Sequence, residues 1–332
     1  MKAVKMLGNR GLEVVDAPVP EARGDEVLIR VRASGICGSD LHALYQRQEP
    51  SRQIPGHEFA GEVVQVDAPR GLKVGNRVTA TAACGCGICH LCRSGDTAYC
   101  RNKGGIGWSR DGADAEYVLV PEASCLPLPD DVSFEVGSLI QDAMGTTYHG
   151  LKKIGVSGMD VLGVFGLGPI GLGAVLVAKQ MGATAIGFDL SAYRLELAKQ
   201  LGADYAFHPD EDPRTAVMEI TQGRGLDKAA ECAGADATLN WCLDLTRIFG
   251  KVALLGEHRR ATINPSGQLI HKGITMSGST CFNLGEYGEL LSLIEKGARP
   301  ERMITHRFPL EEAAEAFRLF ESGQTGKVIF VP

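Results

Sequence analysis

The stretch VLGVFGLGPIGLGAVLVAKQMGATAIGFD, residues 161–189, decides the fold. An apolar run leads into Gly166-Leu167-Gly168-Pro169-Ile170-Gly171, a segment of helical character follows, and a second apolar run closes the stretch. A G-x-G-x-x-G pattern that directly follows a strand and opens a helix is typical of a βαβ unit that binds a dinucleotide. We therefore predict strand 161–166, helix 169–181 and strand 184–189.

The three glycines of this motif have separate expected roles. Gly166 makes a tight turn, Gly168 lets the backbone approach a pyrophosphate, and Gly171 lets helix and strand pack closely. The N-terminus of the following helix adds unpaired N–H groups and a partial positive charge. The alternative is a glycine-rich turn that binds no ligand. The cofactor-binding candidates are Gly166, Leu167, Gly168, Pro169, Ile170 and Gly171.

Two side chains beyond the motif bear on the choice of cofactor. Asp189 ends the second predicted strand, at the distance from Gly166 that is typical of the acidic residue on the adenosine ribose. Its carboxylate would accept hydrogen bonds from ribose hydroxyls and repel a 2′-phosphate, so NAD is expected rather than NADP. Asp189 could instead cap the next helix, in competition with Ser191. Arg194 is a further candidate, because it could stack on adenine or attract a 2′-phosphate.

The alternation of strand and helix continues after this unit. Further strands are predicted at 204–208, 226–232, 251–256 and 274–279, and helices at 191–201, 214–221 and 236–247. Strands that alternate with helices imply a parallel sheet covered on both faces. The predicted fold class is therefore α/β, with a doubly wound sheet of six strands.

The residues on either side of this unit have a different character. Before about residue 140, short β-rich runs at 26–33, 59–66, 77–81 and 115–120 alternate with loops rich in glycine and proline, which predicts a β-rich domain. After the sixth strand come helices at 285–296 and 310–321 and a last strand, KVIFV, at 327–331. We expect this tail to return to the first domain. Residues 1–145 and 285–332 would then form the β-rich domain, with residues 146–284 inserted as the coenzyme domain.

Composition and charge exclude several classes of protein. The 332 residues include 34 Lys and Arg against 40 Asp and Glu, a formal charge of −6, and 44% of them are hydrophobic. This is the composition of an ordinary globular chain rather than a disordered or collagenous one. No apolar run reaches the ~18 residues of a membrane span and no signal peptide is recognised, so we expect a cytoplasmic location. The absence of a basic block argues against nucleic acid as a partner.

Ten cysteines are many for a reducing compartment, and half of them lie within residues 84–100. The spacing Cys86-x2-Cys89-x2-Cys92-x7-Cys100 places four soft ligands in one loop. Four thiolates without an open position are typical of a structural zinc site. An iron–sulfur cluster is the alternative, but the ferredoxin run has a last gap of about three residues and a following proline.

A second group of candidate metal ligands precedes this loop. Cys37-Gly-Ser39-Asp40-Leu-His42 and Gly56-His57-Glu58 lie after β-like segments. Together with the four-cysteine loop, the G-x-G-x-x-G motif and Asp189, in this order along the chain, they resemble the medium-chain, zinc-dependent alcohol and polyol dehydrogenase family. The resemblance covers nearly the whole chain. It implies that the β-rich domain is GroES-like and surrounds an inserted Rossmann coenzyme domain.

The resemblance implies a catalytic zinc with three protein ligands and one open position. Cys37 and His57 match two of the ligands. The third position carries Cys in many alcohol dehydrogenases and Glu in polyol dehydrogenases, and counting back from Thr146 places it on Asp142. A register shifted by one residue would place Gln141 there instead. With the four-cysteine site, two zinc ions per chain are expected.

The resemblance also implies roles for the neighbours of these ligands. Asp40 is expected to hold His57 in the correct tautomer. Glu58 is expected behind the metal, as an alternate ligand. Ser39 and His42 resemble a relay that carries the alcohol proton to solvent.

The activity implied by the resemblance is hydride transfer from a secondary alcohol, polyol or sugar-like substrate to NAD, giving the ketone. Thr146 would pack against the nicotinamide, and Tyr45 and Trp108 are candidate pocket walls, with ordinary packing as the alternative. An amino-alcohol dehydrogenase of the L-threonine type is the alternative function, since its corresponding loop can also carry Asp. A more distant alternative is a zinc-less alkene or quinone reductase, or a nucleotide-binding protein without turnover. Homodimers or homotetramers are usual in this family.

Overall fold

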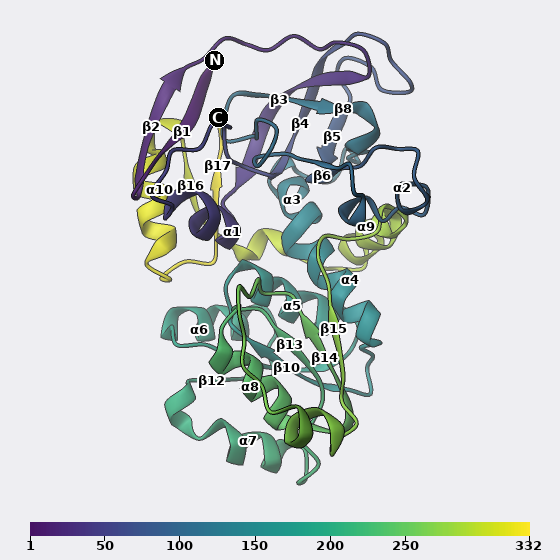
Figure 1. Ribbon diagram of the computed structural model, residues 1–332, viewed down its shortest axis with the longest axis vertical. Coiled ribbons are helices and arrows are strands. Elements are labelled where there is room, and N and C mark those ends of the chain that lie inside the picture. The colour runs from purple at the N-terminus through teal and green to yellow at the C-terminus, as the bar shows by residue number, and fades with distance from the viewer.

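The computed structural model describes residues 1–332, and its two large sheets occupy the two halves of the molecule seen in Figure 1. The lower half contains a six-stranded parallel sheet in the order β12-β11-β10-β13-β14-β15. Its strands are β10 (Val161–Phe165), β11 (Thr184–Phe188), β12 (Tyr205–Phe207), β13 (Leu226–Glu231), β14 (Thr246–Leu254) and β15 (Thr275–Gly278). The predicted doubly wound sheet is confirmed, and its strand order reverses between β10 and β13, where such sheets bind ligands.

Helices lie along this sheet and explain its apolar strands. They are α5 (Pro169–Gln180), α6 (Ala192–Gln200), α7 (Pro213–Ile220) and α8 (Asp236–Leu245). Strands covered on both faces are buried on both, so β10 and β11 have four buried residues in sequence rather than an alternating pattern. Helix α5 begins at Pro169, a residue whose fixed φ suits the first helical position and whose missing N–H costs nothing there.

The upper half is built on a second, mainly antiparallel sheet, in the order β16-β17-β3-β4-β5-β9, with β8 also paired to β3. Its strands are β3 (Glu26–Gly35), β4 (Glu58–Val66), β5 (Arg77–Ala80), β8 (Tyr117–Pro121), β9 (Cys125–Pro127), β16 (Ile304–Phe308) and β17 (Lys327–Phe330). A separate hairpin of β1 (Lys2–Gly8) and β2 (Gly11–Asp16) lies beside α10 (Ala313–Glu321) in Figure 1. Strand β17 runs antiparallel to β3, so the C-terminal strand joins a sheet whose other strands, apart from β16, come from residues 26–127.

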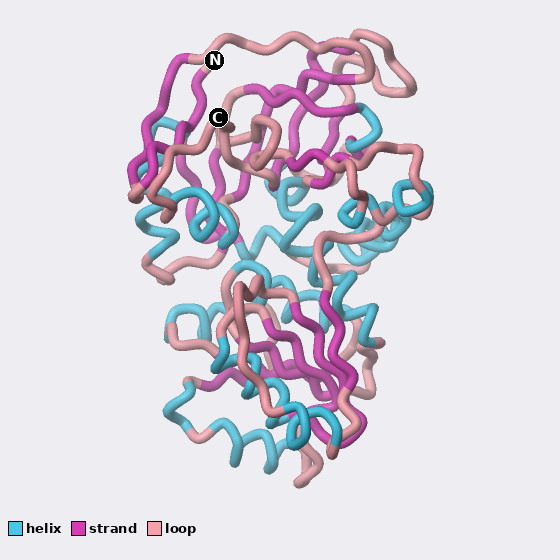
Figure 2. The backbone as a smooth tube through the Cα atoms, viewed as in Figure 1, coloured by secondary structure: helices cyan, strands magenta, loops and turns pink.

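A long helical segment that the sequence analysis did not predict joins the halves. It consists of α3 (Phe134–Leu139), the π-helical turn η4 (Ile140–Met144) and α4 (Gly145–Ile154), continuous in Figure 2. Most residues of η4 are buried, so this turn lacks the one-sided apolar pattern by which a surface helix is recognised. The domain boundary expected at residue 145 falls inside this helical segment.

The apolar core extends across the junction of the two halves. Its largest cluster contains 36 buried residues. The cluster includes Ala60 on β4, Leu139 on α3, Leu172 on α5 and Ile329 on β17. The helical segment 134–154 is thus held by both sheets, which gives any side chain on it a defined position at the junction.

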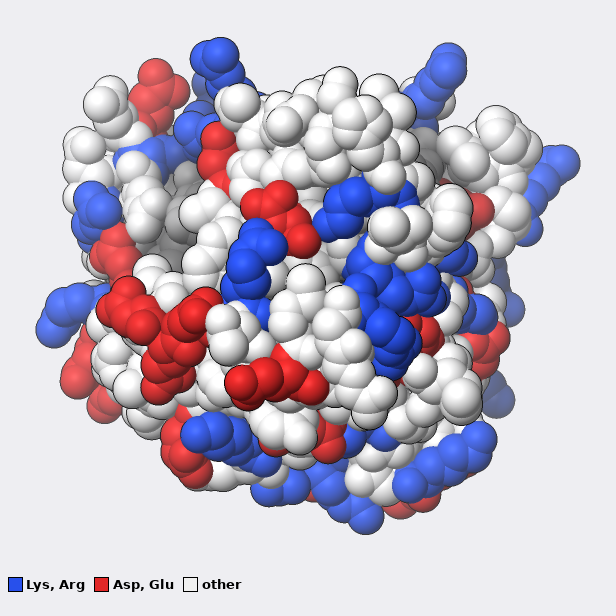
Figure 3. Space-filling view, turned by 90° about the horizontal axis from the view of Figure 1, so that it is seen from below, with Lys and Arg blue, Asp and Glu red and all other residues white.

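Two features of the surface complete the description. Figure 3, which views the molecule from the coenzyme-domain end, shows acidic and basic side chains mixed over that face. None of the helices combines the length and the apolar character needed to span a bilayer.

Candidate active site and metal centres

Four side chains from separate parts of the chain converge at the junction. Cys37, His57, Glu58 and Asp142 each offer one ligand atom, and these atoms lie within 4.8 Å of one another. Cys37 is the N-cap of the short helix α1 (Gly38–Asp40), Glu58 begins β4 directly after His57, and Asp142 projects from η4. Three of the four are buried and Asp142 is half-buried. The helical segment thus supplies the ligand candidate that closes the cluster.

The spacing of these donors fits a single zinc ion. The distance from Asp142 Oδ2 is 3.2 Å to Cys37 Sγ and 3.8 Å to His57 Nε2. Ligand atoms around a tetrahedral zinc, each about 2.0–2.3 Å from the metal, lie about 3.3–3.8 Å apart. On the far side of the imidazole, Nδ1 of His57 lies 3.2 Å from Asp40 Oδ1. Asp40 also accepts the Cys37 N–H at 2.9 Å, so it contacts two of the ligand candidates.

Gln141, the alternative third ligand, takes another direction. It is buried, and its Oε1 accepts the N–H of Ala82 at 3.3 Å. Asp142, by contrast, belongs to the cluster and receives the hydroxyl hydrogen bond of Thr146 on its Oδ1 at 2.6 Å. Thr146, which was expected to face the nicotinamide, therefore also holds the Asp142 carboxylate.

The electrostatics of the cluster are those of a cation site. Burial, with the negative charge of Asp142, raises the pKa of Cys37 to about 12. Burial also raises the pKa of Glu58 to about 8, although the neighbouring Lys327 opposes the shift. For His57 burial works against protonation, but Asp40 and Asp142 outweigh it and raise its pKa. Buried anionic donors this close together repel one another, and a metal ion between them removes that repulsion.

Lys327 is a member of the site that sequence reasoning missed. It comes from β17, and its Nζ pairs with Glu58 Oε1, with both side chains fully buried. Glu58 and Lys327 are therefore both enclosed beside the ligand candidates. The sequence does not predict this pairing, because Lys327 begins the apolar strand KVIFV and its partner lies in a distant part of the sequence.

The other candidate residues differ in how close they lie to the cluster. Trp108 lies against His57, with ring centroids 5.7 Å apart, and Ser39 is half-buried beside Cys37. His42 is exposed one turn further along, where its Nδ1 lies 3.1 Å from an oxygen of Gln46. Tyr45 instead packs on Phe317 in the core of the upper half, with ring centroids 5.3 Å apart. For Tyr45 the packing alternative is therefore the one that the structure supports.

The four cysteines of the second site converge as their spacing predicts. The Sγ–Sγ distances are 3.5 Å for Cys89–Cys92, 3.9 Å for Cys89–Cys100 and 4.0 Å for Cys86–Cys92. Sulfurs around a tetrahedral zinc, each about 2.3 Å from the metal, lie about 3.8 Å apart. Backbone N–H groups of Ile88 and Cys89 lower the pKa of Cys86 to about 6, which favours the thiolate that binds metal. The residues present therefore fit a zinc ion with four thiolate ligands.

The dinucleotide motif has the geometry that its glycines predict. Gly166 has φ +89°, and a Cβ on Gly171 would lie 1.8 Å from the Gly166 carbonyl oxygen. A Cβ on Gly168 would meet only a guanidinium nitrogen of Arg194, at 3.9 Å, so the space above Gly168 is open. Open space over a helix N-terminus with free N–H groups fits a pyrophosphate. No side chain caps this helix.

Asp189 holds the turn of the motif from the end of β11. Its Oδ2 accepts the Leu167 N–H at 2.6 Å and its Oδ1 accepts the Ser191 N–H at 2.8 Å. Ser191, not Asp189, is the side chain that caps α6, by accepting from the Arg194 N–H. The Arg194 side chain donates from Nε to the Thr325 carbonyl at 3.0 Å, so it connects α6 to the C-terminal tail.

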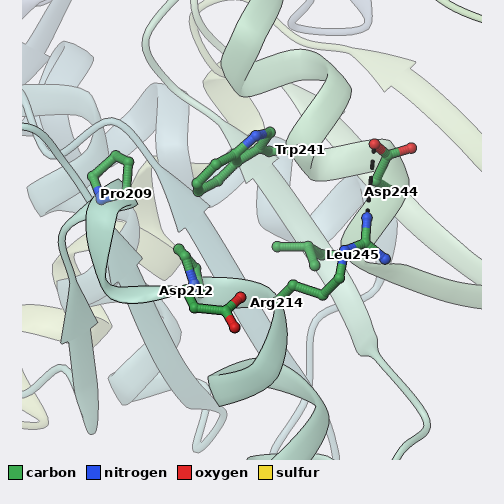
Figure 4. A pocket seen from close by; sticks show the side chains of 7 residues that line it. Pro209, Asp212, Arg214, Trp241, Asp244 and Leu245 are labelled. Carbon is green, nitrogen blue, oxygen red and sulfur yellow. Dashed lines mark ion pairs between the residues drawn. The ribbon is translucent and has the colours of Figure 1, made fainter.

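A pocket of about 210 Å³ lies elsewhere on the coenzyme domain, between the start of α7 and α8 (Figure 4). Its labelled side chains are Pro209, Asp212, Arg214, Trp241, Asp244 and Leu245. Arg214 and Asp244 form a long ion pair of 4.0 Å across one side of it. The pocket contains no residue of the metal clusters or of the glycine motif.

Comparison with known proteins agrees with both halves of this description. Residues 23–130 match the family model of the alcohol dehydrogenase GroES-like domain, and residues 169–296 match that of zinc-binding dehydrogenases. An L-threonine 3-dehydrogenase of Chromobacterium violaceum is 36% identical over 339 residues, 99% of each chain. Among solved structures, alcohol dehydrogenase TADH from Thermus sp. ATN1 has a TM-score of 0.92 and 30% identity, covering 100% of both chains. Galactitol-1-phosphate dehydrogenase from Escherichia coli has a TM-score of 0.90 and 27% identity, also over 100% of both.

Fold and site together define an oxidoreductase that uses a nicotinamide dinucleotide and zinc. The chain belongs to the zinc-dependent, medium-chain dehydrogenase family. The family resemblance, the α/β fold with a GroES-like domain and the two classes of cofactor are thereby confirmed.

Proposed function

We propose that this enzyme oxidises the secondary hydroxyl group of an amino alcohol of the L-threonine type, with NAD as the hydride acceptor. The oxidation is inferred from the cluster of Cys37, His57 and the half-buried Asp142 at the junction of the two halves of the molecule. The amino-alcohol substrate is supported by relatives named L-threonine 3-dehydrogenase that are 34–36% identical and match 99% of their length. The polyol or sugar-like substrate expected at first becomes the second candidate, supported by the likeness to galactitol-1-phosphate dehydrogenase.

In this proposal Cys37, His57 and Asp142 hold the catalytic zinc, and Cys86, Cys89, Cys92 and Cys100 hold the structural one. Zinc at the first site supplies a Lewis acid that polarises the substrate hydroxyl and lowers its pKa. Asp40 orients His57 by facing its Nδ1, as a carboxylate commonly does for a ligating histidine. Glu58 stays beside the ligands as an alternate donor.

The chain's own residues would carry the hydroxyl proton outward. Ser39 is half-buried near Cys37, whereas His42 is exposed and follows it by one helical turn. A proton that passes from the substrate to the Ser39 hydroxyl and then to the His42 imidazole reaches bulk water. His42 suits the outer position because it is exposed and an imidazole can both accept and donate a proton.

The cofactor would lie along the carboxyl ends of β10 and β11. The N–H groups of Gly168, Ile170 and Gly171 would face the pyrophosphate, and Asp189 would face the adenosine ribose and favour NAD over NADP. Arg194, next to Gly168, contributes positive charge at the same place. Thr146 lies on the nicotinamide side, close to the metal cluster.

The organisation around the site completes the proposal. We place the GroES-like domain at residues 1–145 and 285–332 and the coenzyme domain at 146–284. We further propose a cytoplasmic enzyme that forms a homodimer or homotetramer, and light scattering coupled to size exclusion measures that assembly.

A substrate screen tests the proposed function. Protein with a measured zinc content is assayed for NAD reduction with L-threonine, L-serine, sorbitol, galactitol 1-phosphate and 2-butanol, with Cys37→Ala as the control that lacks a zinc ligand. The highest kcat/KM is expected with L-threonine, and no turnover is expected from the control. Preference for a polyol would favour the second candidate. Turnover by the control, or one zinc per chain or fewer in the wild type, would contradict zinc-dependent oxidation.

A further inference from the structure

We propose that Asn283 is a positioning residue through which the four-cysteine loop fixes the helical turn that carries Asp142. Asn283 lies in the connection between β15 and α9 (Tyr287–Glu295), where the chain leaves the coenzyme domain. Figure 1 shows α9 close to α2 (His90–Arg93), the helix inside the four-cysteine loop. The inference goes beyond the proposed function, because it concerns the action of one metal loop on the other site and is independent of the alcohol oxidised.

On one side, Asn283 is bound to the backbone of the four-cysteine loop. Its Nδ2 donates to the Ser94 carbonyl at 2.8 Å and to Asp96 Oδ1 at 2.7 Å, and the next N–H along the chain, that of Leu284, donates to the Gly95 carbonyl at 3.0 Å. Gly95 has φ +89°, and a Cβ there would lie 2.4 Å from Asn283 Oδ1, so the approach requires glycine. All three contacts fall between the third and fourth cysteines of the loop.

The same side chain also fixes its own segment. Asn283 Oδ1 accepts the Gly285 N–H at 2.8 Å, and Glu286 Oε2 accepts the Asn283 N–H at 3.3 Å, which together form a capping box. Every polar atom of the Asn283 side chain is therefore in a hydrogen bond. One amide group thus contacts both the loop and the segment 283–286.

On its other side, the segment packs against the turn that carries Asp142. Phe282 is 2% exposed, and a Cβ on Gly145 would lie 2.5 Å from its ring. Gly145 follows η4 and precedes Thr146, whose hydroxyl holds the Asp142 carboxylate. Cys281 adopts φ +51°, a conformation that costs a non-glycine residue energy and that the surrounding structure must enforce.

These contacts form an unbroken path from one metal site to the other. It runs from Asp96 to Asn283 by a hydrogen bond, along one peptide bond to Phe282, and then by close packing to Gly145. From Gly145 one peptide bond leads to Thr146, whose hydroxyl donates to Asp142. Packed interiors transmit displacements because they contain little free volume. A shift of the loop at 94–96 therefore moves the carboxylate of Asp142.

Hydrogen exchange with mass spectrometry tests this coupling in the zinc-loaded, full-length protein. Asn283→Asp keeps the acceptor for the Gly285 N–H but removes both donors and places a carboxylate against Asp96. The double variant Asn283→Asp/Asp96→Asn restores a donor across the same gap. Asn264→Asp is the matched control, because Asn264 caps a short helical segment in the coenzyme domain by accepting from the Gly267 N–H.

In Asn283→Asp, exchange is expected to become roughly tenfold faster in peptides covering both 279–286 and 140–147, the effect of about one lost hydrogen bond. The double variant is expected to return toward wild type and the control to stay unchanged. Faster exchange at 279–286 with wild-type exchange at 140–147 would overturn the proposal. If Asn283→Asp does not fold, Asp96→Ala serves instead: it removes one hydrogen bond of Asn283 and, within the loop, the one that the Ser94 hydroxyl donates. It must still accelerate exchange at 140–147, and unchanged exchange there is the contrary result. Because no readout uses turnover, failure here is distinct from failure of the proposed function.

Discussion

Lys327 and Glu58 form an ion pair in which neither side chain has any exposed surface, although 269 positions separate them in the chain. Strand β3 lies between β4, which begins with Glu58, and β17, which begins with Lys327. The Lys327 stem also lies 2.7 Å from where a Cβ on Gly35 would be, so the side chain is enclosed. The pair thus holds the C-terminal strand to the edge of the metal cluster.

Removal of one partner from this pair should be strongly destabilising. Lys327→Met leaves the Glu58 carboxylate buried without its cation, which should lower the free energy of unfolding by about 3–5 kcal/mol. Urea unfolding of the zinc-loaded protein measures this loss. The double variant Lys327→Met/Glu58→Gln should recover most of it, because no charge is then left unpaired. A single variant as stable as the wild type would show that the pair contributes no stability.

The choice of third ligand between neighbouring residues can be decided by zinc content. Asp142→Ala should lose the catalytic zinc, leaving about one zinc per chain, and should lower kcat/KM by more than roughly 100-fold, the upper range for disturbing the support of a ligand. Gln141→Ala removes only a hydrogen bond to the Ala82 N–H, so it should retain two zinc ions. NADH binding by both variants, followed by fluorescence, should stay near wild type. The reverse pattern of zinc loss would assign the ligand to Gln141.

Asp189 should determine the choice of dinucleotide. Asp189→Ser removes the carboxylate that repels a 2′-phosphate and accepts the Leu167 N–H, so the KM for NAD should rise roughly tenfold, as expected for about one lost hydrogen bond. The ratio of kcat/KM with NADP to that with NAD should rise as well. Asp210→Ser is the control, since that side chain is 90% exposed. A wild-type enzyme faster with NADP would refute the assignment.

Replacement of Gly173 should destabilise the fold, because α5 lies in close contact with the turn that carries Asp142. A Cβ on Gly173 would lie 2.0 Å from the Ala143 carbonyl oxygen, so Gly173→Ala should cost about 1–3 kcal/mol through overpacking. Gly288, inside α9, has open space where its Cβ would be, so Gly288→Ala should stabilise by about 0.5–1 kcal/mol through helix propensity. Thermal unfolding should show a lower melting temperature for Gly173→Ala and a higher one for Gly288→Ala. Equal shifts of the two melting temperatures would contradict the packing argument.

Acid stability should depend on an ion pair between the tail and α3. Arg307 donates two hydrogen bonds to Glu135, at 2.8 and 2.7 Å, and they lower the pKa of that carboxyl below its usual 4.5. A lowered folded-state pKa stabilises the fold above pH 4.5, and this contribution is lost as the pH falls through the folded-state value. Since both side chains are partly exposed, Arg307→Gln should cost less than about 1 kcal/mol. The difference in unfolding free energy between wild type and Arg307→Gln should have its full value at pH 7 and shrink below pH 4.5. A difference that does not change with pH would contradict this role of the ion pair.

Much of the fold can be predicted from local sequence, because the coenzyme sheet and the four-cysteine site are each built from segments that are close together in the chain. Each βαβ step of the coenzyme sheet is a short contiguous segment, and its central strands are buried. The cysteines of one metal site lie within fifteen residues, so spacing alone predicts their convergence. The helical segment 134–154 was missed because its middle turn, η4, is buried on most sides and interrupts the pattern of a surface helix.

Parts of the site that depend on distant contacts could not be predicted in the same way. Asp142 could be placed only to within one residue, and the structure separates it from Gln141 by the direction in which each side chain points. Lys327 and Asn283 have no local signature, since their partners lie in segments far away along the chain. For Tyr45 the sequence could not distinguish a pocket wall from a core residue, because an aromatic residue near a ligand motif looks the same in either role. The structure places it in the core, against Phe317.

The pairing of β17 with β3 also constrains the order of events during synthesis. The six strands of the coenzyme sheet are contiguous in the chain, so that sheet can form as soon as its own residues have left the ribosome. The GroES-like sheet lacks β16 and β17 until the tail is made, so the end of β3 at Ser34 and Gly35 has no β17 partner meanwhile, although β8 already pairs with residues 26–30. Unpaired edges invite association with other chains. In the nascent protein the end of β3 therefore stays open to such association until β17 is made.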